Sequence, residues 1–306
     1  MIVTVTLNPA LHVHYQADRV VLGGANGVGR VRFEAGGRGL AVARLLHTFG
    51  HEVVAAGLAG GSAGELIRNE LAKAGVATQF TRIGAESRRV VRIADASAGL
   101  LTSFQEPAPY ITTEELGRLA ADYRTLLDGA TAVVLCGSLP TGLPAEIYGS
   151  LTSYATGAGV PVILDAAGSA LRYGAARGPA LAIPDISQPA SGAAGCLQSA
   201  DSVVAELMAA GANSVVLLTE GGTRAVTANE RWQAAALMPP APGDPGEQAL
   251  AGRRAALVAG FVPGVAFGWS WPDMLRHAVA LSASVTPDGE ADLAAYEKLL
   301  PEVTVA

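Results

Sequence analysis

The sequence predicts an α/β protein built on a largely parallel sheet with helices on both faces. Two observations lead to this fold class. Short apolar segments alternate with segments of helical pattern along most of the chain. Residues 132–136 and 160–164 are apolar throughout, which is typical of strands that are covered on both faces. Ligands of such sheets bind at the carboxyl ends of the strands, so the residues that follow each strand are the first site candidates.

The first fifty residues contain one strand, an irregular stretch and one helix. Residues 2–7 alternate as a strand does. Residues 11–33 alternate irregularly with several glycines, which indicates short strands of a small side sheet. A glycine turn at 35–39 then opens a helix over 40–49, and Gly50 ends it.

The rest of the chain alternates strands with helices. Further strands are expected at 53–58, 132–136, 160–164, 180–183 and 214–218, and a hairpin at 223–227 and 232–237. Helices are expected at 65–74, 113–127, 144–157, 201–210, 271–284 and 291–300. Residues 78–83, 88–94 and 99–105 alternate like a small antiparallel flap. A turn at Gly252 is expected to open one more, buried helix, apolar over 255–261.

Composition bounds the possible partners and location. The chain has 306 residues and a formal net charge of −6, which argues against broad nucleic-acid binding. Its two cysteines, Cys136 and Cys196, form no disulfide framework and are expected to behave as small buried hydrophobes. The first residues do not form a signal peptide, and no membrane span is expected. A cytoplasmic protein is therefore expected.

An ordered set of short motifs carries a resemblance to one family. The motifs are residues 1–11 (MIVTVTLNPAL), Gly36-Gly37-Arg38-Gly39, Gly60-Gly61, Gly64-Glu65-Leu66-Ile67, Gly137-Ser138-Leu139-Pro140 and Val258-Ala259-Gly260-Phe261. Together they resemble the ribokinase-like (phosphofructokinase-B) sugar kinases, in the branch of 1-phosphofructokinase and tagatose-6-phosphate kinase. The likeness covers about residues 1–300.

This resemblance implies a fold and a partner. The whole chain, 1–306, should form a single ribokinase-like domain, a three-layer α/β/α sandwich. A small β-sheet lid should be formed by about 11–33 and 85–105. Lids in this branch often pair, so a homodimer through the lid is expected.

The resemblance also exposes the loss of the catalytic base. The family's second glycine signature should read Gly-Ala-Gly-Asp, and the Asp position is Ala255 here. In the family that Asp takes the proton from the attacking sugar hydroxyl, and loss of such a base typically costs about 10²–10⁴-fold in rate. Gly252 remains, and Arg253 and Arg254 fill the next two positions. At a helix start these residues either bind an anion or form a solvated pair pointing away.

Nucleotide and magnesium elements of the family are degenerate as well. The family's Lys-Pro-Asn is matched by Ile183-Pro184-Asp185, and Gln188 stands at the following Glu position. The nucleotide turn aligns with 219–223, where Glu220 occupies a glycine position and would repel a triphosphate, although Gly222 is kept. ATP and Mg²⁺ are therefore expected only if the chain is an active kinase.

The substrate end of the expected site keeps a phosphate-binding set and loses sugar contacts. The resemblance places Gly37, Arg38, Arg88 and Ser138 at the substrate phosphate. Arg38 replaces the family's Lys and keeps the charge. His12, Ala41 and Val90 stand where the family holds sugar hydroxyls with Asp and Asn. His12 lies two residues before His14 on one strand face, but no further metal ligand is evident nearby, so no metal site is expected.

Three functions follow, in order of preference. The favoured hypothesis is a pseudokinase that binds a phosphosugar, another anion or a partner protein, with lost or strongly reduced phosphoryl transfer. The second is an active carbohydrate kinase with relocated groups, either Arg253 and Arg254 at the phosphoryl group or a rescued base such as Asp244 or Glu247. The third is a cleft adapted to a nucleotide-independent reaction.

Overall fold

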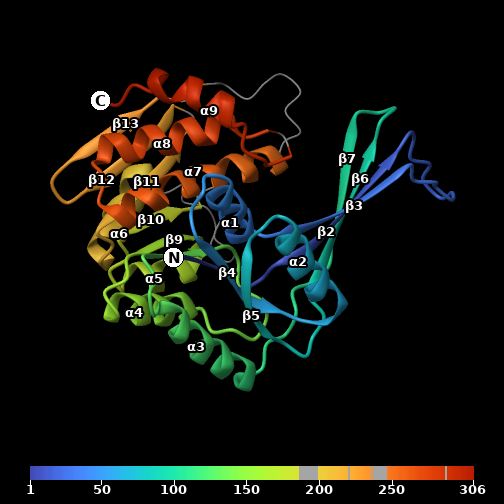
Figure 1. Ribbon diagram of the computed structural model, residues 1–306, viewed down its shortest axis with the longest axis horizontal. Coiled ribbons are helices and arrows are strands. Elements are labelled where there is room, and N and C mark those ends of the chain that lie inside the picture. The colour runs from blue at the N-terminus through green and yellow to red at the C-terminus, as the bar shows by residue number, and fades with distance from the viewer. Residues whose placement is uncertain (186–198, 220, 236, 238–246, 287) are drawn as a thin grey trace.

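The computed structural model describes residues 1–185, 199–219, 221–235, 237, 247–286 and 288–306. Its body is built on a nine-stranded sheet, shown in Figure 1, with the order β13-β12-β11-β10-β9-β8-β1-β4-β5. The strands are β1 (Ile2–Thr6), β4 (Val53–Ala59), β5 (Ala77–Arg82), β8 (Ala132–Cys136), β9 (Val162–Ala166), β10 (Leu181–Pro184), β11 (Ser214–Thr219), β12 (Gly222–Thr227) and β13 (Arg231–Ala234).

Seven neighbouring strands of this sheet, from β5 to β11, run parallel, and β12 and β13 add an antiparallel edge. β1 lies between β4 and β8, and Val3 pairs with Val54 on one side and Val133 on the other. Every residue of β1, β8 and β9 is buried. The expected α/β class and its both-sides-covered sheet are thereby confirmed.

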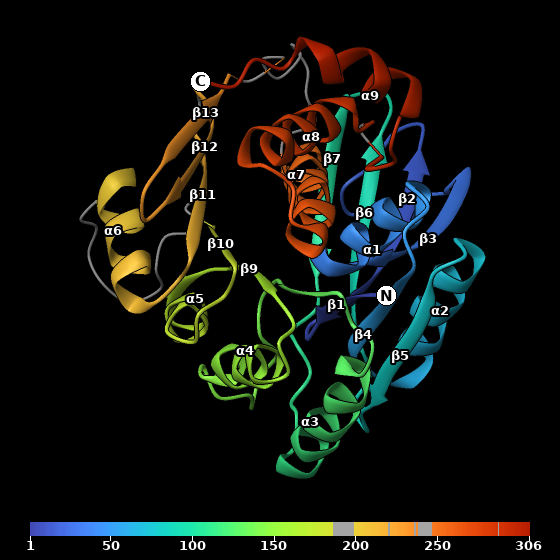
Figure 2. The ribbon, with the colours of Figure 1, turned by 60° about the vertical axis from the view of Figure 1, so that its left-hand side comes forward.

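Helices cover both faces and make three layers (Figure 2). One face carries α1 (Arg38–Thr48), α2 (Gly61–Lys73), α7 (Glu247–Phe267), α8 (Trp271–Ser284) and α9 (Leu293–Leu299). The other carries α3 (Thr113–Leu127), α4 (Ile147–Gly157), α5 (Gly168–Ala175) and α6 (Ala200–Ala210). Alternate residues of each strand face the two layers, so the sheet separates two apolar cores.

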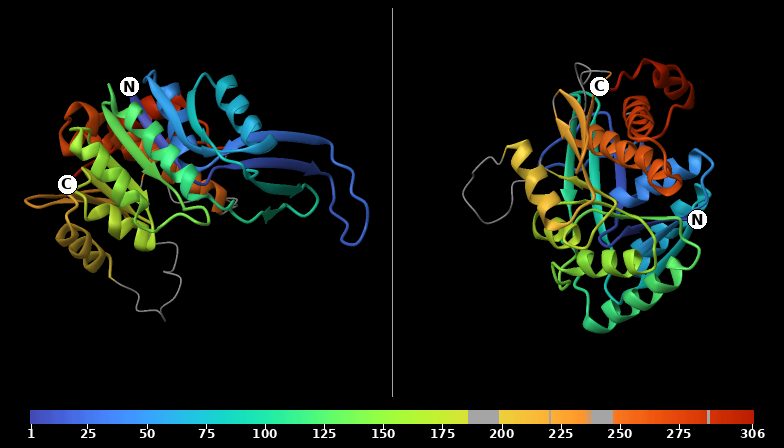
Figure 3. Two further views of the ribbon diagram at one scale, coloured as in Figure 1. Left: turned by 90° about the horizontal axis from the view of Figure 1, so that it is seen from below. Right: turned by 90° about the vertical axis from the view of Figure 1, so that its left-hand side faces the viewer.

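A separate four-stranded sheet, the lid, projects from one side of the body (Figures 1 and 3). Its order is β3-β2-β6-β7, with β2 (Ala10–Ala17), β3 (Arg30–Gly36), β6 (Arg88–Asp95) and β7 (Leu100–Gln105). Residues 78–83 were expected to belong to this flap. That was wrong, because β5 (Ala77–Arg82) pairs parallel with β4 and forms the edge strand of the large sheet.

The two faces of the lid differ in character. His12 pairs with Glu34 and Val90, and His14 with Arg32 and Arg92, so one face is largely polar. Val13 pairs with Phe33 on one side and with Val91 on the other, and Val91 in turn pairs with Phe104. The other face of the lid is therefore apolar. Residues of α2 share a core cluster with Leu11 and Val13 and cover the part of this apolar face that lies nearest the body.

The central helix α7 begins earlier than the sequence suggests. A helix start was expected at Gly252, but α7 runs from Glu247 to Phe267, so Gly252 lies more than one turn inside it. Gly260 allows close packing, because a Cβ there would lie 2.4 Å from the Ala278 Cα of α8. Residues 249–267 are long and apolar enough to cross a membrane, contrary to the expectation that no segment would be. Here, however, this helix packs against α8 and α1 as a core helix.

Candidate functional site

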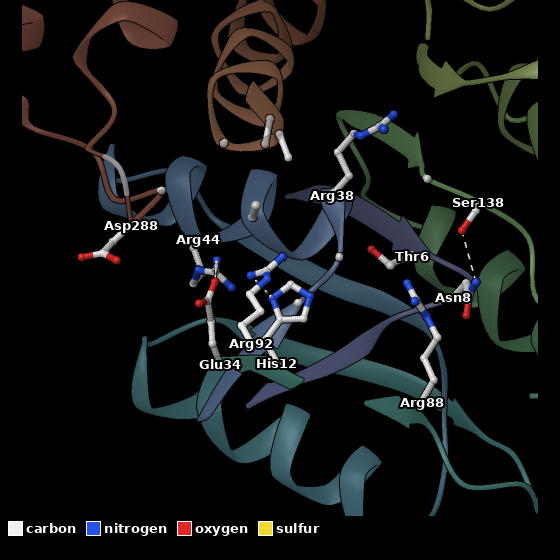
Figure 4. A pocket seen from close by; sticks show the side chains of 18 residues that line it. Thr6, Asn8, His12, Glu34, Arg38, Arg44, Arg88, Arg92, Ser138 and Asp288 are labelled. Atoms are coloured by element: carbon white, nitrogen blue, oxygen red, sulfur yellow. Dashed lines mark hydrogen bonds and ion pairs between the residues drawn. The ribbon is translucent and has the colours of Figure 1, made fainter. Parts of the chain in front are cut away.

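A cavity of about 250 Å³ lies between the polar face of the lid, the start of α1 and α7 (Figure 4). Its floor is the carboxyl end of β1 with Thr6 and Asn8, and the carboxyl end of β8 with Gly137 and Ser138. In the sheet, β1 is followed by β4 and β5 on one side and by β8, β9 and β10 on the other. The cavity therefore lies at the point where the direction of strand order changes, where open α/β sheets bind ligands.

One end of the cavity has polar atoms without partners; we call Thr6, Asn8, Arg88 and Ser138 the open end. Asn8 donates through Nδ2 to Ser138 Oγ at 3.1 Å. Thr6 and Asn8 are 2% and 8% exposed, and no described residue hydrogen-bonds Thr6 Oγ1, Asn8 Oδ1 or Arg88 Nε. Figure 4 shows the Arg88 guanidinium pointing toward Asn8. Burial lowers the pKa of Arg88, and no acidic side chain of the described chain compensates its charge. Unsatisfied buried groups of this kind are costly unless a ligand or water meets them.

His12 lies on the lid side of the cavity. Its Nδ1 is 3.1 Å from Arg92 Nη1. Burial and the Arg92 charge lower the pKa of His12 to about 3, so its ring is neutral at physiological pH. The ring lies directly over Gly36, where a Cβ would come within 2.1 Å of His12 Nε2. Only glycine at position 36 leaves room for this imidazole.

His12, His14 and Glu34 offer ligand atoms within 4.8 Å of one another, a grouping that the sequence analysis did not expect. Glu34 Oε2 lies 3.1 Å from His14 Nε2, and Glu34 Oε1 accepts from Arg44 at 3.2 Å. Burial raises the pKa of Glu34, but the His14 hydrogen bond and the Arg44 charge outweigh it and bring the pKa to about 2. Because guanidinium groups surround this carboxylate and would repel a divalent cation, we assign the cluster as an ion-pair network.

A second part of the site is filled by its own charges; we call Arg38, Asp165, Asp185 and Arg254 the closed corner. Arg38 donates to Asp165 Oδ1 at 3.0 Å and to Asp185 Oδ2 at 2.7 Å. Arg254 donates to the same Asp165 oxygen from Nε at 3.0 Å and Nη2 at 2.6 Å, and to the Ile183 carbonyl at 3.0 Å. Asp165 is completely buried. Burial alone would lower the pKa of Arg38, but the two carboxylates raise it.

Arg38 was expected at a substrate phosphate, and the structure directs it elsewhere. It lines the cavity at the start of α1, and Figure 4 shows its guanidinium pointing away from Arg88. The guanidinium is instead bound to the two aspartates. Gly37, the N-cap of this helix, has φ 135°, and a Cβ there would lie 2.9 Å from Thr6 Cγ2. The cavity walls contain all five substrate-binding residues that were expected from the sequence: Gly37, Arg38, Arg88, Ser138 and His12.

The expected anion site at a helix start is absent from residues 252–255. These residues lie inside α7, where backbone N–H groups bond to carbonyls one turn earlier. Gly252 and Ala255 line the cavity, and Ala255 is 1% exposed. The Arg253 carbonyl accepts from Ser282 Oγ at 3.0 Å, and Arg254 is bound to Asp165. The alternative of a solvated pair is also wrong for Arg254, because it points inward.

The residues expected for a degenerate nucleotide site are only partly described. Asp185 follows β10 and is held by Arg38. Gly222 begins β12, and its carbonyl accepts from Thr219 Oγ1, away from the cavity walls. Gln188 and Glu220 lie outside the described residues, as do Cys196 and Asp244. The expected buried Cys136 is confirmed, and burial raises the pKa of its thiol.

Sequence reasoning missed several cavity residues. Thr6 and Asn8 end the first strand, so the rule that ligands bind at carboxyl strand ends pointed to them. Glu34 and Arg44 had no such signal, because their positions depend on the pairing of β2 with β3 and on helix α1. Asp165 follows the strand expected at 160–164, but nothing in the sequence pointed to its partners Arg38 and Arg254.

This architecture defines an α/β carbohydrate-kinase fold with a β-sheet lid. The model of the pfkB family of carbohydrate kinases matches residues 12–295, and the chain belongs to this family. The fold is similar to that of a possible 1-phosphofructokinase from Thermotoga maritima, with 24% identity, 100% of this chain and 99% of that chain covered, and a TM-score of 0.83.

Two further structures show the same fold. Escherichia coli phosphofructokinase-2, solved with its substrates and products, has 24% identity, 98% coverage of each chain and a TM-score of 0.81. A carbohydrate kinase from Agrobacterium tumefaciens has 14% identity, 100% and 99% coverage, and a TM-score of 0.73. At these identities the likeness carries the architecture, and the chemistry must be argued from the residues present.

Proposed function

We propose that this protein is a cytoplasmic pseudokinase that binds a small phosphorylated anion at the open end and does not transfer phosphoryl groups from ATP. One observation carries the proposal: Arg38 and Arg254, the residue that precedes Ala255, are both bound to buried Asp165. The family resemblance puts a catalytic Asp at position 255, and alanine accepts no proton. The only described carboxylates in the closed corner are held by arginines.

The residues present do not fit ATP with Mg²⁺. A magnesium ion needs carboxylate oxygens that are free to coordinate it. Asp165 Oδ1 receives three hydrogen bonds from Arg38 and Arg254, and Asp185 is bound to Arg38. Asp165 Oδ2 has no hydrogen-bond partner among the described residues, but it is buried beside two guanidinium groups, whose charges repel a divalent cation. Arg254 also occupies the space beside Ile183, where the family match would place phosphate-ordering groups.

Ligand binding at the open end has a separate basis. Arg88 presents an uncompensated guanidinium beside the unpaired polar atoms of Thr6 and Asn8. Arginine binds phosphate oxygens in bidentate fashion, and such charge-assisted bonds are among the strongest available to a protein. A phosphate group would satisfy Arg88 Nε and restore the compensation that the described chain lacks.

A thermal-shift series tests both the binding of a phosphorylated anion and the lack of binding of Mg·ATP. Phosphate esters at about 100 times their Kd should stabilise the protein by about 2.7 kcal/mol, and Mg·ATP should leave the melting temperature unchanged. Arg88→Met should abolish the ester shift, whereas Arg82→Met, an exposed arginine outside the cavity, should keep it. Robust turnover of fructose 1-phosphate or tagatose 6-phosphate with Mg·ATP would overturn the pseudokinase and support the active kinase with relocated groups.

We further propose that two copies pair through the apolar lid face. Val31, Phe33, Leu100 and Phe104 lie on this face and are 46%, 42%, 64% and 59% exposed. Exposed apolar side chains clustered on one sheet face mark an interaction surface. Light scattering should give twice the chain mass, and Phe33→Asp with Phe104→Asp should give the single mass. A monomeric wild-type protein would contradict this proposal.

A further inference from the structure

The cavity presents a hydrogen-bond donor at His12. Arginine has no acceptor atom, so in the contact between Arg92 and His12 the guanidinium donates and His12 Nδ1 accepts. The ring is neutral at physiological pH, because burial and the Arg92 charge bring its pKa to about 3. A neutral imidazole that accepts at Nδ1 carries its proton on Nε2. Arg92 thus selects the tautomer, as a second partner often does for histidine.

This donor is available to a ligand. His12 Nε2 lies over Gly36, and both residues line the cavity. No described side chain or backbone carbonyl accepts from Nε2 within hydrogen-bonding distance. In Figure 4 the ring stands between the open end, with Arg88 and Asn8, and the Glu34–Arg44 pair.

Acceptors for ligand hydroxyls are scarce away from the open end. Glu34 is used by His14 and Arg44, and the closed-corner carboxylates are used by Arg38 and Arg254. Asp288, at the rim, lies 3.6 Å from Arg32. Besides Arg38 and Arg44, which are donors, α1 and α7 contribute Ala41, Ala251, Gly252 and Ala255 to the wall, and none of these four has a side-chain acceptor. A polyhydroxylated body would leave hydroxyl donors without partners, which costs affinity.

We infer that the ligand is a small phosphorylated carboxylic acid with few hydroxyl groups: Arg88 takes the phosphate and His12 Nε2–H donates to the carboxylate. The inference rests on the proposed anion site and specifies what that site selects. Thr6, a buried residue whose unpaired hydroxyl can donate, lies beside Arg88 at the phosphate end. His12 stands where the family has an aspartate. A carboxylate at this position would repel an acidic ligand, whereas the neutral imidazole donates a hydrogen bond to it. The difference at position 12 is therefore a change of specificity.

Calorimetric titration with four probes tests this assignment: 2-phosphoglycolate, ethyl phosphate, glycerol 3-phosphate and fructose 1-phosphate. We expect 2-phosphoglycolate to bind about 10- to 100-fold more tightly than glycerol 3-phosphate, the range of one hydrogen bond to a charged group. Ethyl phosphate should bind at least as well as glycerol 3-phosphate. If either hydroxylated ester binds most tightly, the inference is wrong and the anion site stands.

His12→Phe separates the donor from general charge attraction. It should reduce the preference for 2-phosphoglycolate over ethyl phosphate to below about 3-fold, whereas His51→Phe, outside the cavity, should preserve it. A full preference retained in a folded His12→Phe would overturn the role of the donor. If His12→Phe does not fold, the wild-type order of the four probes still decides between acid and sugar. If none of the probes binds and Arg88→Met changes nothing, the proposed function itself fails.

Discussion

The closed corner and the open end both contain arginines, but only those of the closed corner are paired with carboxylates in the described part of the chain. In the closed corner, Arg38 and Arg254 are bound to aspartates within the chain, and Asp165 is completely buried. At the open end, Arg88 has no acidic partner among the described residues. The difference teaches that cationic side chains near a family site do not by themselves indicate ligand binding. A cationic side chain is available to a ligand only where the fold supplies no counter-ion for it.

The largest expected effect breaks the closed corner. Asp165→Ala leaves Arg38 and Arg254 partly uncompensated in a buried site, and removal of one partner from such a cluster typically costs about 3–5 kcal/mol. Urea unfolding should report this loss. Asp201→Ala, which removes the exposed partner of Arg224, should cost far less, because solvent screens this pair. Equal losses in the two variants would show that the closed corner is not an energetic unit.

The next effect is a pH dependence that originates at His12. Its folded-state pKa of about 3 lies below the usual 6.5, so the unfolded chain binds the proton first as the pH falls. Stability is therefore fully present above pH 6.5 and is lost toward pH 3, with a slope of about 1.4 kcal/mol per pH unit. Denaturation of His12→Asn across this range should show a shallower slope than the wild type. An unchanged slope would mean that His12 titrates normally.

A smaller effect, of opposite sign to that of Asp165, is expected at Arg88. Without ligand, Arg88→Met should raise the free energy of unfolding or change it by less than about 1 kcal/mol, because a desolvated and uncompensated charge is removed. Urea unfolding of the ligand-free variant measures it. A loss of several kcal/mol would show that Arg88 has a structural partner and would weaken the comparison between the two ends.

The smallest effect concerns the ion pair between lid and body. Arg32 Nη2 lies 3.6 Å from Asp288, and both side chains are exposed, by 38% and 73%. Arg32→Ala should therefore cost less than about 1 kcal/mol, and its effect should vanish in 1 M salt. Thermal unfolding at low and high salt measures it. A larger, salt-independent loss would assign Arg32 a buried role through Glu34, 3.5 Å away.

The sequence alone determined the order and type of most elements, because apolar periodicity and glycine turns act over short stretches of chain. It also showed Ala255 at the position of the family's Asp. It missed α5, whose eight residues include two glycines and a tyrosine and give a weak helical signal. It also placed the start of α7 at Gly252, since a glycine between two alanine-rich stretches looks like a break.

Only the tertiary structure decided which charges meet. Arg38 is separated from Asp185 by 147 residues, and Asp165 from Arg254 by 89, so no local pattern relates them. Their meeting depends on β9 and β10 being neighbours in the sheet and on α7 packing across their ends. Local conformation is encoded by neighbouring residues, whereas the neutralisation of a buried charge depends on the folded arrangement of distant strand ends.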